Sequence, residues 1–239
     1  MESKTLISSI RENIGKVMVG SEETIDLLLT ALIAEGHVLI EDVPGMGKTV
    51  LAKSLAKSVS LEFNRIQFTP DLLPSDVTGL NYFDQKANDF VFSPGPAFCN
   101  LLLADEINRA TPRTQSSLLE CMGERQITVD GVTRPLSAPF FVIATQNPVE
   151  QLGTYRLPEA QLDRFMMKVS MGYPEKEREE ADIVRRALNG EAVKLLSPVT
   201  TREEIMEMKK EIQSVTVHDD IMNYAVEIAR GTRKSRYLT

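Results

Sequence analysis

Residues 45–49 have the types and spacing of a loop that binds phosphate groups, Gly45-Met46-Gly47-Lys48-Thr49. In such a loop, backbone N–H groups surround the α- and β-phosphates, the lysine reaches the β- and γ-phosphates, and the threonine hydroxyl holds Mg²⁺. The full pattern has a further glycine where this chain has Asp42. An ordinary turn before a lysine-bearing helix is the alternative, and the flanking strand and helix favour the phosphate loop.

Two acidic residues, Asp105 and Glu106, directly follow the apolar run Leu101–Ala104. An apolar run without alternation is typical of a strand buried on both faces of a parallel sheet. Open α/β sheets bind their ligands at the carboxyl ends of such strands. There the first acid can hold the Mg²⁺ shell, and the second can orient or deprotonate an attacking water. A solvated strand end would look the same, but the glycine loop upstream favours the functional interpretation.

A second buried run, residues 140–144, leads to Asn147 and Pro148. The Asn147 amide could bind a γ-phosphate or the attacking water, or it could only begin a turn before the proline. The residues alone leave both interpretations open. Arg164 follows a short helix that is predicted to start at Pro158, where a lone arginine is more commonly a surface cation.

The elements that must position these residues alternate between strand and helix, which predicts an α/β fold with a parallel sheet. Apolar residues at helical spacing predict helices near 6–17 and 22–36, with Ser21 as an N-cap, and another helix follows the glycine loop. The predicted strands cover 38–40, 61–68, 101–104, 140–144 and 165–171.

Two hairpins are predicted within this alternation. Residues 69–96 contain four prolines and two aromatic runs, which predict a hairpin near 80–93. Its aromatic side chains are expected to belong to the core rather than to an exposed surface. A second hairpin is predicted near 125–136, because alternating residues run into Asp130-Gly131, a typical two-residue turn.

The composition becomes charged and helical after Gly172, so residues 1–172 are predicted to form the core and 173–239 a small helical domain. Pro174 is expected to start its first helix. The second helix has a predicted capping box, Thr201 with Glu204, and a third helix follows.

The overall composition is that of a globular protein, with 42% hydrophobic and 26% charged residues and a formal net charge of −7. This acidic total argues against a general electrostatic contact with nucleic acid. No signal peptide and no apolar run of membrane-spanning length occur, so we expect a cytoplasmic protein without membrane insertion. Cys99 and Cys121 are the only cysteines, and we expect both to be buried apolar residues rather than metal ligands.

Four motifs in order closely resemble those of the MoxR family of AAA+ ATPases: the glycine loop, Leu103–Ala110, Ala144–Pro148 and Leu157–Phe165. The resemblance covers nearly the whole chain. It implies a five-stranded parallel AAA+ core with a helical lid, ATP or ADP and Mg²⁺ bound between them, and a homo-oligomeric ring, usually of six subunits.

The resemblance also implies roles for individual residues. Asp105 and Thr49 would bind Mg²⁺, and Glu106 would be the catalytic base. Asn147 would sense the γ-phosphate, and Arg164 would be an arginine finger that reaches a neighbouring subunit's nucleotide. The implied nucleotide contacts are Val19, Gly20, Pro44, Gly45, Met46, Gly47, Lys48, Thr49 and Val50. In relatives the two hairpins tend to face the central pore.

One departure from the family concerns the lid. Family members usually carry a second sensor arginine in a Gly-Ala-Ser-Pro-Arg-like motif, and this chain has no such motif up to Thr239. Arg233 and Arg236 are basic residues in that neighbourhood, but neither lies in a matching context. We therefore expect an incomplete lid and poor hydrolysis.

Three functions follow from these expectations. The resemblance suggests an ATP-hydrolysing, chaperone-like factor that matures or activates other proteins, often with a partner that contains a von Willebrand factor A domain. A DNA- or RNA-remodelling motor is an alternative, and the acidic net charge argues against it. A nucleotide-gated binding module with little turnover is the third.

Overall fold

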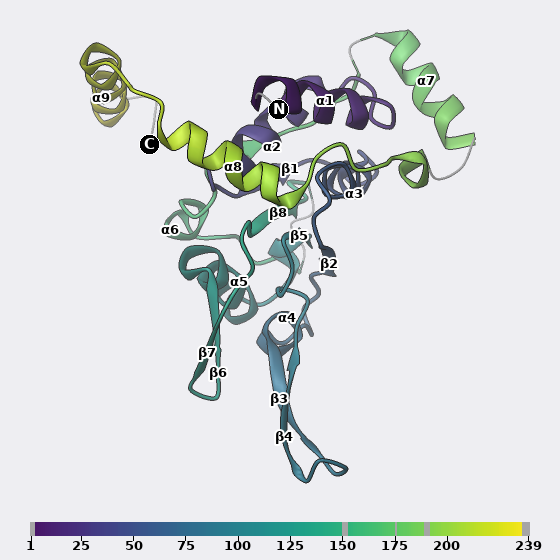
Figure 1. The fold of residues 1–239 in the computed structure, drawn as a ribbon, viewed down its shortest axis with the longest axis vertical. Coiled ribbons are helices and arrows are strands. Elements are labelled where there is room, and N and C mark those ends of the chain that lie inside the picture. The colour runs from purple at the N-terminus through teal and green to yellow at the C-terminus, as the bar shows by residue number, and fades with distance from the viewer. Residues whose placement is uncertain (1–2, 150–152, 175, 189–191, 236–239) are drawn as a thin grey trace.

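The computed structural model describes residues 3–149, 153–174, 176–188 and 192–235 (Figure 1). At its centre lies a five-stranded parallel sheet with the order β2-β5-β8-β1-β9. The strands are β1 Val38–Glu41, β2 Phe63–Gln67, β5 Leu101–Asp105, β8 Phe141–Gln146 and β9 Met167–Val169. These strands lie at the five predicted places, which confirms the predicted α/β fold class.

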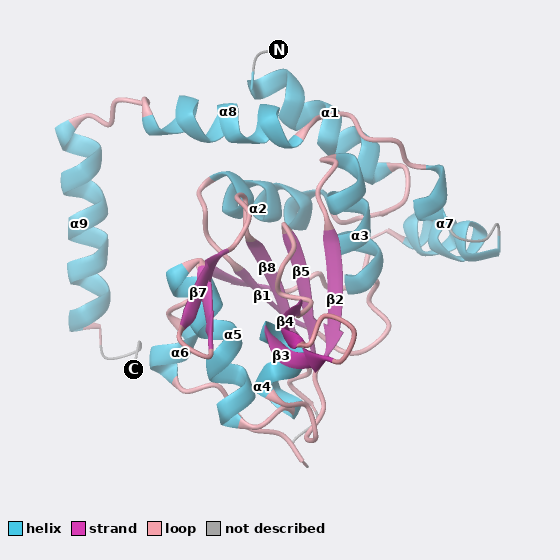
Figure 2. Ribbon diagram, turned by 60° about the horizontal axis from the view of Figure 1, so that its bottom comes forward, coloured by secondary structure: helices cyan, strands magenta, loops and turns pink. Residues whose placement is uncertain are grey.

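Helices cover both faces of this sheet (Figure 2). They are α1 Ser3–Gly15, α2 Glu22–Ile33, α3 Lys48–Ser58, α4 Pro74–Thr78, α5 Pro112–Glu124, α6 Glu159–Leu162, α7 Glu177–Leu188, α8 Arg202–Gln213 and α9 Asp219–Lys234. Short 3₁₀ turns are formed by Ile107–Arg109 and Ala192–Leu195. None of the helices within the described ranges is long and apolar enough to cross a membrane.

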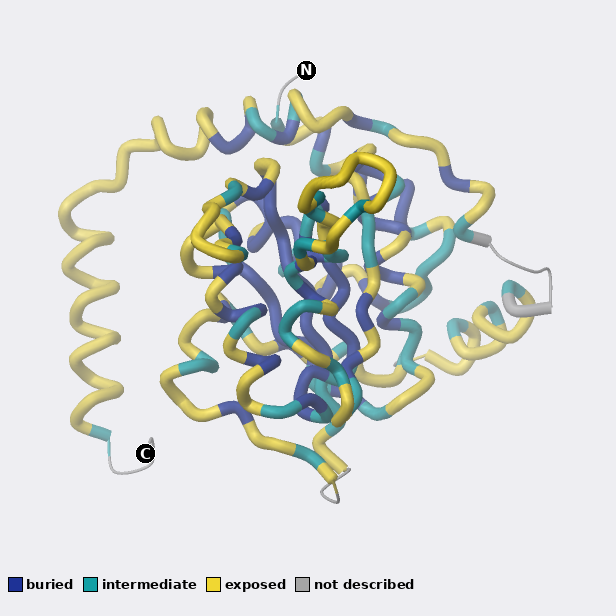
Figure 3. Tube along the Cα trace, turned by 90° about the horizontal axis from the view of Figure 1, so that it is seen from below, coloured by how far each residue is buried: buried dark blue, intermediate teal, exposed yellow. Residues whose placement is uncertain are grey.

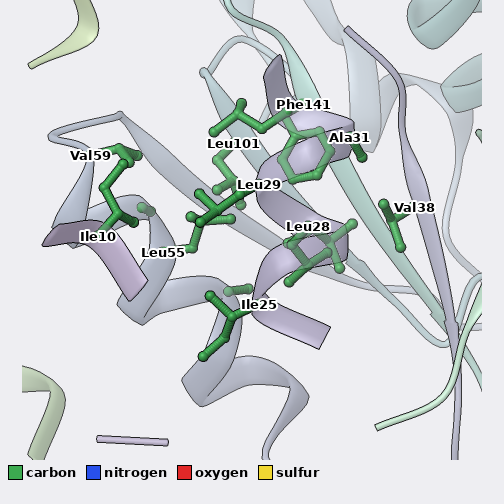
Figure 4. Close-up of a cluster of buried hydrophobic side chains, with 14 of the residues drawn as sticks. Ile10, Ile25, Leu28, Leu29, Ala31, Val38, Leu55, Val59, Leu101 and Phe141 are labelled. Carbon is green, nitrogen blue, oxygen red and sulfur yellow. The ribbon is translucent and has the colours of Figure 1, made fainter. Parts of the chain in front are cut away.

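Alternate residues of β5 enter two different cores, one on each face of the sheet. Leu101 and Leu103 pack in a core that includes α1, α2 and α3, whereas Leu102 and Ala104 pack in the core beneath α5. Figure 4 shows the first core, where leucines and isoleucines of three helices meet Phe141 of β8. Burial of each such side chain stabilises the fold by about 2 kcal/mol. The double coverage explains why this strand is apolar from Leu101 to Ala104 without alternation.

Both predicted hairpins are present and extend from the same side of the molecule (Figure 1). The first pairs β3 Gly79–Asp84 with β4 Asp89–Pro94, and the second pairs β6 Gln126–Val129 with β7 Val132–Pro135. Asp130 and Gly131, with φ of 50° and 76°, form the predicted turn. The hairpins touch where the Asn81 amide donates to the Asp130 carboxylate at 2.7 Å.

The prediction that the aromatic side chains of the first hairpin are core residues is wrong for most of them. Tyr82, Phe83 and Phe90 are 46%, 49% and 69% exposed. This two-stranded hairpin stands away from the sheet, so no second layer covers these rings. Phe83 and Phe90 pack edge-on against each other. Phe92, nearer the body, packs edge-on against Phe98.

The C-terminal helices differ from one another in how far they are buried. α8 inserts Ile205 and Met208 into the same core as α1 and α2, and its capping box is present as predicted. α7 starts at Glu177 rather than at the predicted Pro174. α9 is exposed along its length (Figure 3).

Of the two basic residues considered near the missing lid motif, Arg233 lies on α9, and Arg236 lies outside the described residues. The domain boundary at residue 172 stays a prediction.

Candidate nucleotide site

The glycine loop joins the end of β1 to the start of α3. Gly45 and Gly47 have φ of 88° and 82°, which a residue with a side chain adopts only with strain. Gly47 is the N-cap of α3, and the helix begins at Lys48. The first N–H groups of a helix have no partner within it and, together with the helix dipole, favour an anion. The local geometry is therefore that of a phosphate-binding loop.

Lys48 is a buried cation among acidic groups. Its residue is 9% exposed, and its Nζ donates to the backbone carbonyl of Asp42 at 2.7 Å. Burial lowers the pKa of Lys48, and the carboxylates of Asp105, Asp42 and Glu106 raise it in opposition. A bound phosphate could replace the carbonyl as the partner of this ammonium group.

Asp105 lies at the carboxyl end of β5 and is held from two sides. The Thr145 hydroxyl on β8 donates to Oδ1 at 2.6 Å, and the Arg65 guanidinium on β2 donates to Oδ2 at 2.6 and 3.1 Å. Neither partner was predicted, because both come from neighbouring strands and follow no motif in the sequence. The two partners fix the orientation of the carboxylate, and Arg65 compensates its negative charge. The Asp105 side chain is only 12% exposed.

Glu106 has a left-handed backbone with φ of 56°, and it follows the strand end directly. Its N–H donates to the same Thr145 hydroxyl at 2.9 Å. The carboxylate accepts a hydrogen bond from the Gln67 amide at 2.7 Å and pairs with Arg109 at 3.1 Å. The two acids thus lie side by side on a common support, with their carboxylates held by different partners.

The donor set at this sheet edge suits Mg²⁺. A carboxylate and a hydroxyl, here those of Asp105 and Thr49, are the oxygen ligands that Mg²⁺ takes together with phosphate oxygens and water. Within the described part of the chain, no group of three or more His, Cys, Asp and Glu residues could hold a metal ion. A metal bound here would therefore depend on the nucleotide for further ligands. Cys99 and Cys121 are buried, as predicted.

A cavity of about 920 Å³ opens beside the glycine loop. It lies between the turn after α1, the start of α3, the segment Met171–Pro174 and α7. Seven of the nine predicted nucleotide contacts line it: Val19, Gly20, Gly45, Met46, Gly47, Thr49 and Val50. Pro44 and Lys48 are absent from its described lining. Sequence reasoning missed its apolar walls, Met18, Tyr173, Ile183 and Val184, which no motif marks.

The structure places Asn147 and Arg164 away from this cavity's described lining. Asn147 follows β8 and is half-buried. Its side-chain oxygen accepts the N–H of Val149 at 3.1 Å, so Asn147 begins a turn, which is one of the two roles considered for it. Arg164 is exposed just after α6, against Gly123 near the end of α5. Figures 1 and 2 both show α6 and α3 on opposite sides of the core.

A parallel sheet with a glycine loop after one strand, an acid pair after another and a cavity beside them defines a P-loop nucleotide-binding protein. The chain belongs to the ATPase family associated with various cellular activities (AAA), whose family model matches residues 37–167, and within it to the MoxR type.

Three relatives illustrate this membership. The chain is 52% identical to the protein YeaC of Bacillus subtilis, with 96% of this chain and 71% of YeaC covered. It is 40% identical to the chaperone MoxR1 of Mycobacterium tuberculosis, with 99% of this chain covered, but it spans only 62% of MoxR1. A crystal structure from Cytophaga hutchinsonii is 43% identical and superposes with a TM-score of 0.88, over 96% of this chain and 69% of that one.

Proposed function

We propose that this protein binds ATP with Mg²⁺ and hydrolyses its γ-phosphate. The observation that carries the proposal is the pair Asp105 and Glu106, held at the sheet edge by Thr145 with the Lys48 ammonium close enough to interact with both carboxylates. The cavity beside the loop is large enough for a nucleoside, and its lining supports placing the base there.

Each residue of the site has a task in this reaction. The loop N–H groups and Lys48 bind the β- and γ-phosphates, and Thr49 and Asp105 hold Mg²⁺, which neutralises charge on the phosphate oxygens. Glu106 orients a water and accepts its proton as the water oxygen bonds to the γ-phosphorus. The bond from that phosphorus to the bridging oxygen breaks, and the products are ADP and inorganic phosphate. Asn147 would contact the γ-phosphate or this water.

Arg164 is proposed to act in trans, in a homo-oligomeric ring that is expected to be a hexamer. Its exposed position on the α6 side of the core supports contact with a neighbouring subunit's nucleotide. An arginine supplied by a partner is worth on the order of 10³ to 10⁵ in rate. The rate per subunit should therefore rise with protein concentration, and Arg164→Ala should remove that rise; a rate independent of concentration would contradict action in trans.

The central test uses Glu106→Gln. This variant removes the base but keeps the shape and one acceptor oxygen, so ATP affinity in isothermal calorimetry should stay near that of the wild type. Steady-state phosphate release should fall by about 10² or more, as when a general base is lost. Asp105→Asn is the matched comparison, because it should instead weaken Mg²⁺-dependent binding. Undiminished phosphate release by Glu106→Gln would refute the assignment of the base.

We further propose a chaperone-like role in the cytoplasm, in the maturation or activation of other proteins. The similarity to a protein named a chaperone supports this role, and the acidic net charge favours a protein client over nucleic acid. A partner with a von Willebrand factor A domain is the partner class that fits this role. The proposed division is a nucleotide-binding core, residues 1–172, and a helical lid, residues 173–239, whose α7 lines the cavity.

A further inference from the structure

Asp42 is the residue at which the glycine loop departs from its pattern. A glycine there would have no side chain, whereas the Asp42 carboxylate is buried, with the residue 9% exposed. Its Oδ1 accepts the Ser170 hydroxyl at 3.0 Å, and its Oδ2 accepts the backbone N–H of Met171 at 2.5 Å. Both donors belong to the segment that directly follows β9.

The same residue also contacts the phosphate end of the site. Its backbone carbonyl accepts the Lys48 ammonium at 2.7 Å, and its N–H donates to Gln146 of the neighbouring strand at 3.3 Å. Asp42 therefore bonds to the phosphate-binding lysine with its main chain and to the segment after β9 with its side chain.

The segment that Asp42 holds is a wall of the cavity. Met171, Gly172, Tyr173 and Pro174 all line it, and Pro174 lies directly beside Gly20 in the turn after α1. A carboxylate bonded to a backbone N–H is a charge-assisted hydrogen bond, roughly twice as strong as a neutral one, and burial protects it from water. This bond fixes where the wall begins relative to the phosphate loop.

We propose that Asp42 is a positioning residue that sets the distance between the phosphate loop and the base-binding wall of the cavity. It thereby contributes to the affinity for the nucleoside part of ATP, in addition to the effect that its charge has on the phosphates of any ligand. The inference rests on the proposed function, because it assumes that the cavity receives the base and ribose. It also gives a reason for an acid at a position where the loop pattern has glycine.

The test compares two ligands in the same variants by isothermal calorimetry with Mg²⁺: ATP and inorganic tripolyphosphate, which has the phosphates without the nucleoside. Removal of the Asp42 charge acts on the phosphates of both ligands alike, so the ratio of their dissociation constants isolates the wall. In Asp42→Gly the dissociation constant for ATP should rise about tenfold relative to that for tripolyphosphate, because the variant loses both hydrogen bonds to the segment after β9. Asp42→Asn keeps one acceptor oxygen and should give an intermediate shift.

Ser170→Ala is the matched control, because it removes only the longer of the two bonds and leaves the loop sequence intact. It should shift the ratio by about threefold or less. Thermal melting of each variant checks that the protein is folded; if Asp42→Gly does not fold, Asp42→Asn and Ser170→Ala carry the test.

Equal losses for ATP and tripolyphosphate, or an unchanged ratio, would overturn the role of Asp42. Failure of the wild-type protein to bind ATP would instead refute the proposed function. The two failures are therefore distinguishable in a single set of titrations.

Discussion

Gly123 offers a way to displace Arg164 without mutating it. A Cβ added at Gly123 would lie 1.9 Å from Nη1 of Arg164 and 3.0 Å from its Cζ. Carbon and nitrogen atoms that are not bonded approach no closer than about 3.4 Å, so the guanidinium must move by about 1.5 Å in Gly123→Ala. Because Arg164 is exposed and flexible, it can move without distorting the backbone.

Stability and activity should then change in opposite directions. Gly123 is the second-to-last residue of α5, where alanine should raise the free energy of unfolding by up to about 1 kcal/mol. That gain corresponds to roughly 2 °C in melting temperature for a chain of this size. A displacement of about 1 Å of a reacting group can cost on the order of 10² in rate. We expect ATP hydrolysis per subunit to fall by about that factor while the protein becomes no less stable.

The assay measures phosphate release at high protein concentration together with thermal melting, for Gly123→Ala, Arg164→Ala and the double variant. Gly231→Ala is the matched control, since a Cβ there meets nothing within 4 Å on the helix α9. The double variant should be no slower than Arg164→Ala. Wild-type hydrolysis by Gly123→Ala, under conditions where Arg164→Ala is slow, would refute the finger assignment or its position against α5.

Three further predictions concern stability. Thr145→Val removes the donor to Asp105 and the acceptor for Glu106, so urea unfolding should show a loss of about 1–3 kcal/mol; a smaller loss would mean that water replaces the hydroxyl. Burial lowers the pKa of His37 to about 4, so the unfolded chain binds its proton first as pH falls. The contribution of neutral His37 to the free energy of unfolding should be fully present above pH 6.5. It should be lost as the pH falls towards 4, by up to about 3 kcal/mol, and His37→Asn should flatten this decline. Lys209 of α8 is buried and forms an ion pair with Glu35 at 3.4 Å. Lys209→Met should cost less than about 1 kcal/mol in the same assay, because Glu35 keeps its ion pair with Arg125 at 2.8 Å.

The hairpin aromatics illustrate how a local pattern can be correct while burial is not. Alternation and turn chemistry predict the hairpin itself, because pairing between β3 and β4 depends on residues close in sequence. Whether Phe83 and Phe90 are covered depends on what lies above the hairpin, and nothing in the described structure covers them. The general tendency of aromatic residues to be buried does not show what lies above one particular hairpin.

The glycine loop, the acid pair and the five strands are properties that the sequence by itself determined. Each is a short run whose residue types answer a local requirement: positive φ at Gly45 and Gly47, a helix start at Lys48, or burial on both faces of β5. Such requirements act within a few residues, so they leave a readable pattern.

Only the tertiary structure decided which residues hold these groups in place. Arg65 and Thr145 reach Asp105 from adjacent strands, and Asp42 reaches the segment after β9, more than a hundred residues further along the chain. These contacts depend on strand order and register, and a single side chain that serves a distant partner follows no periodicity. For that reason Asp42 looks like a defect in the sequence pattern, whereas in the folded protein it joins the phosphate loop to the wall of the cavity.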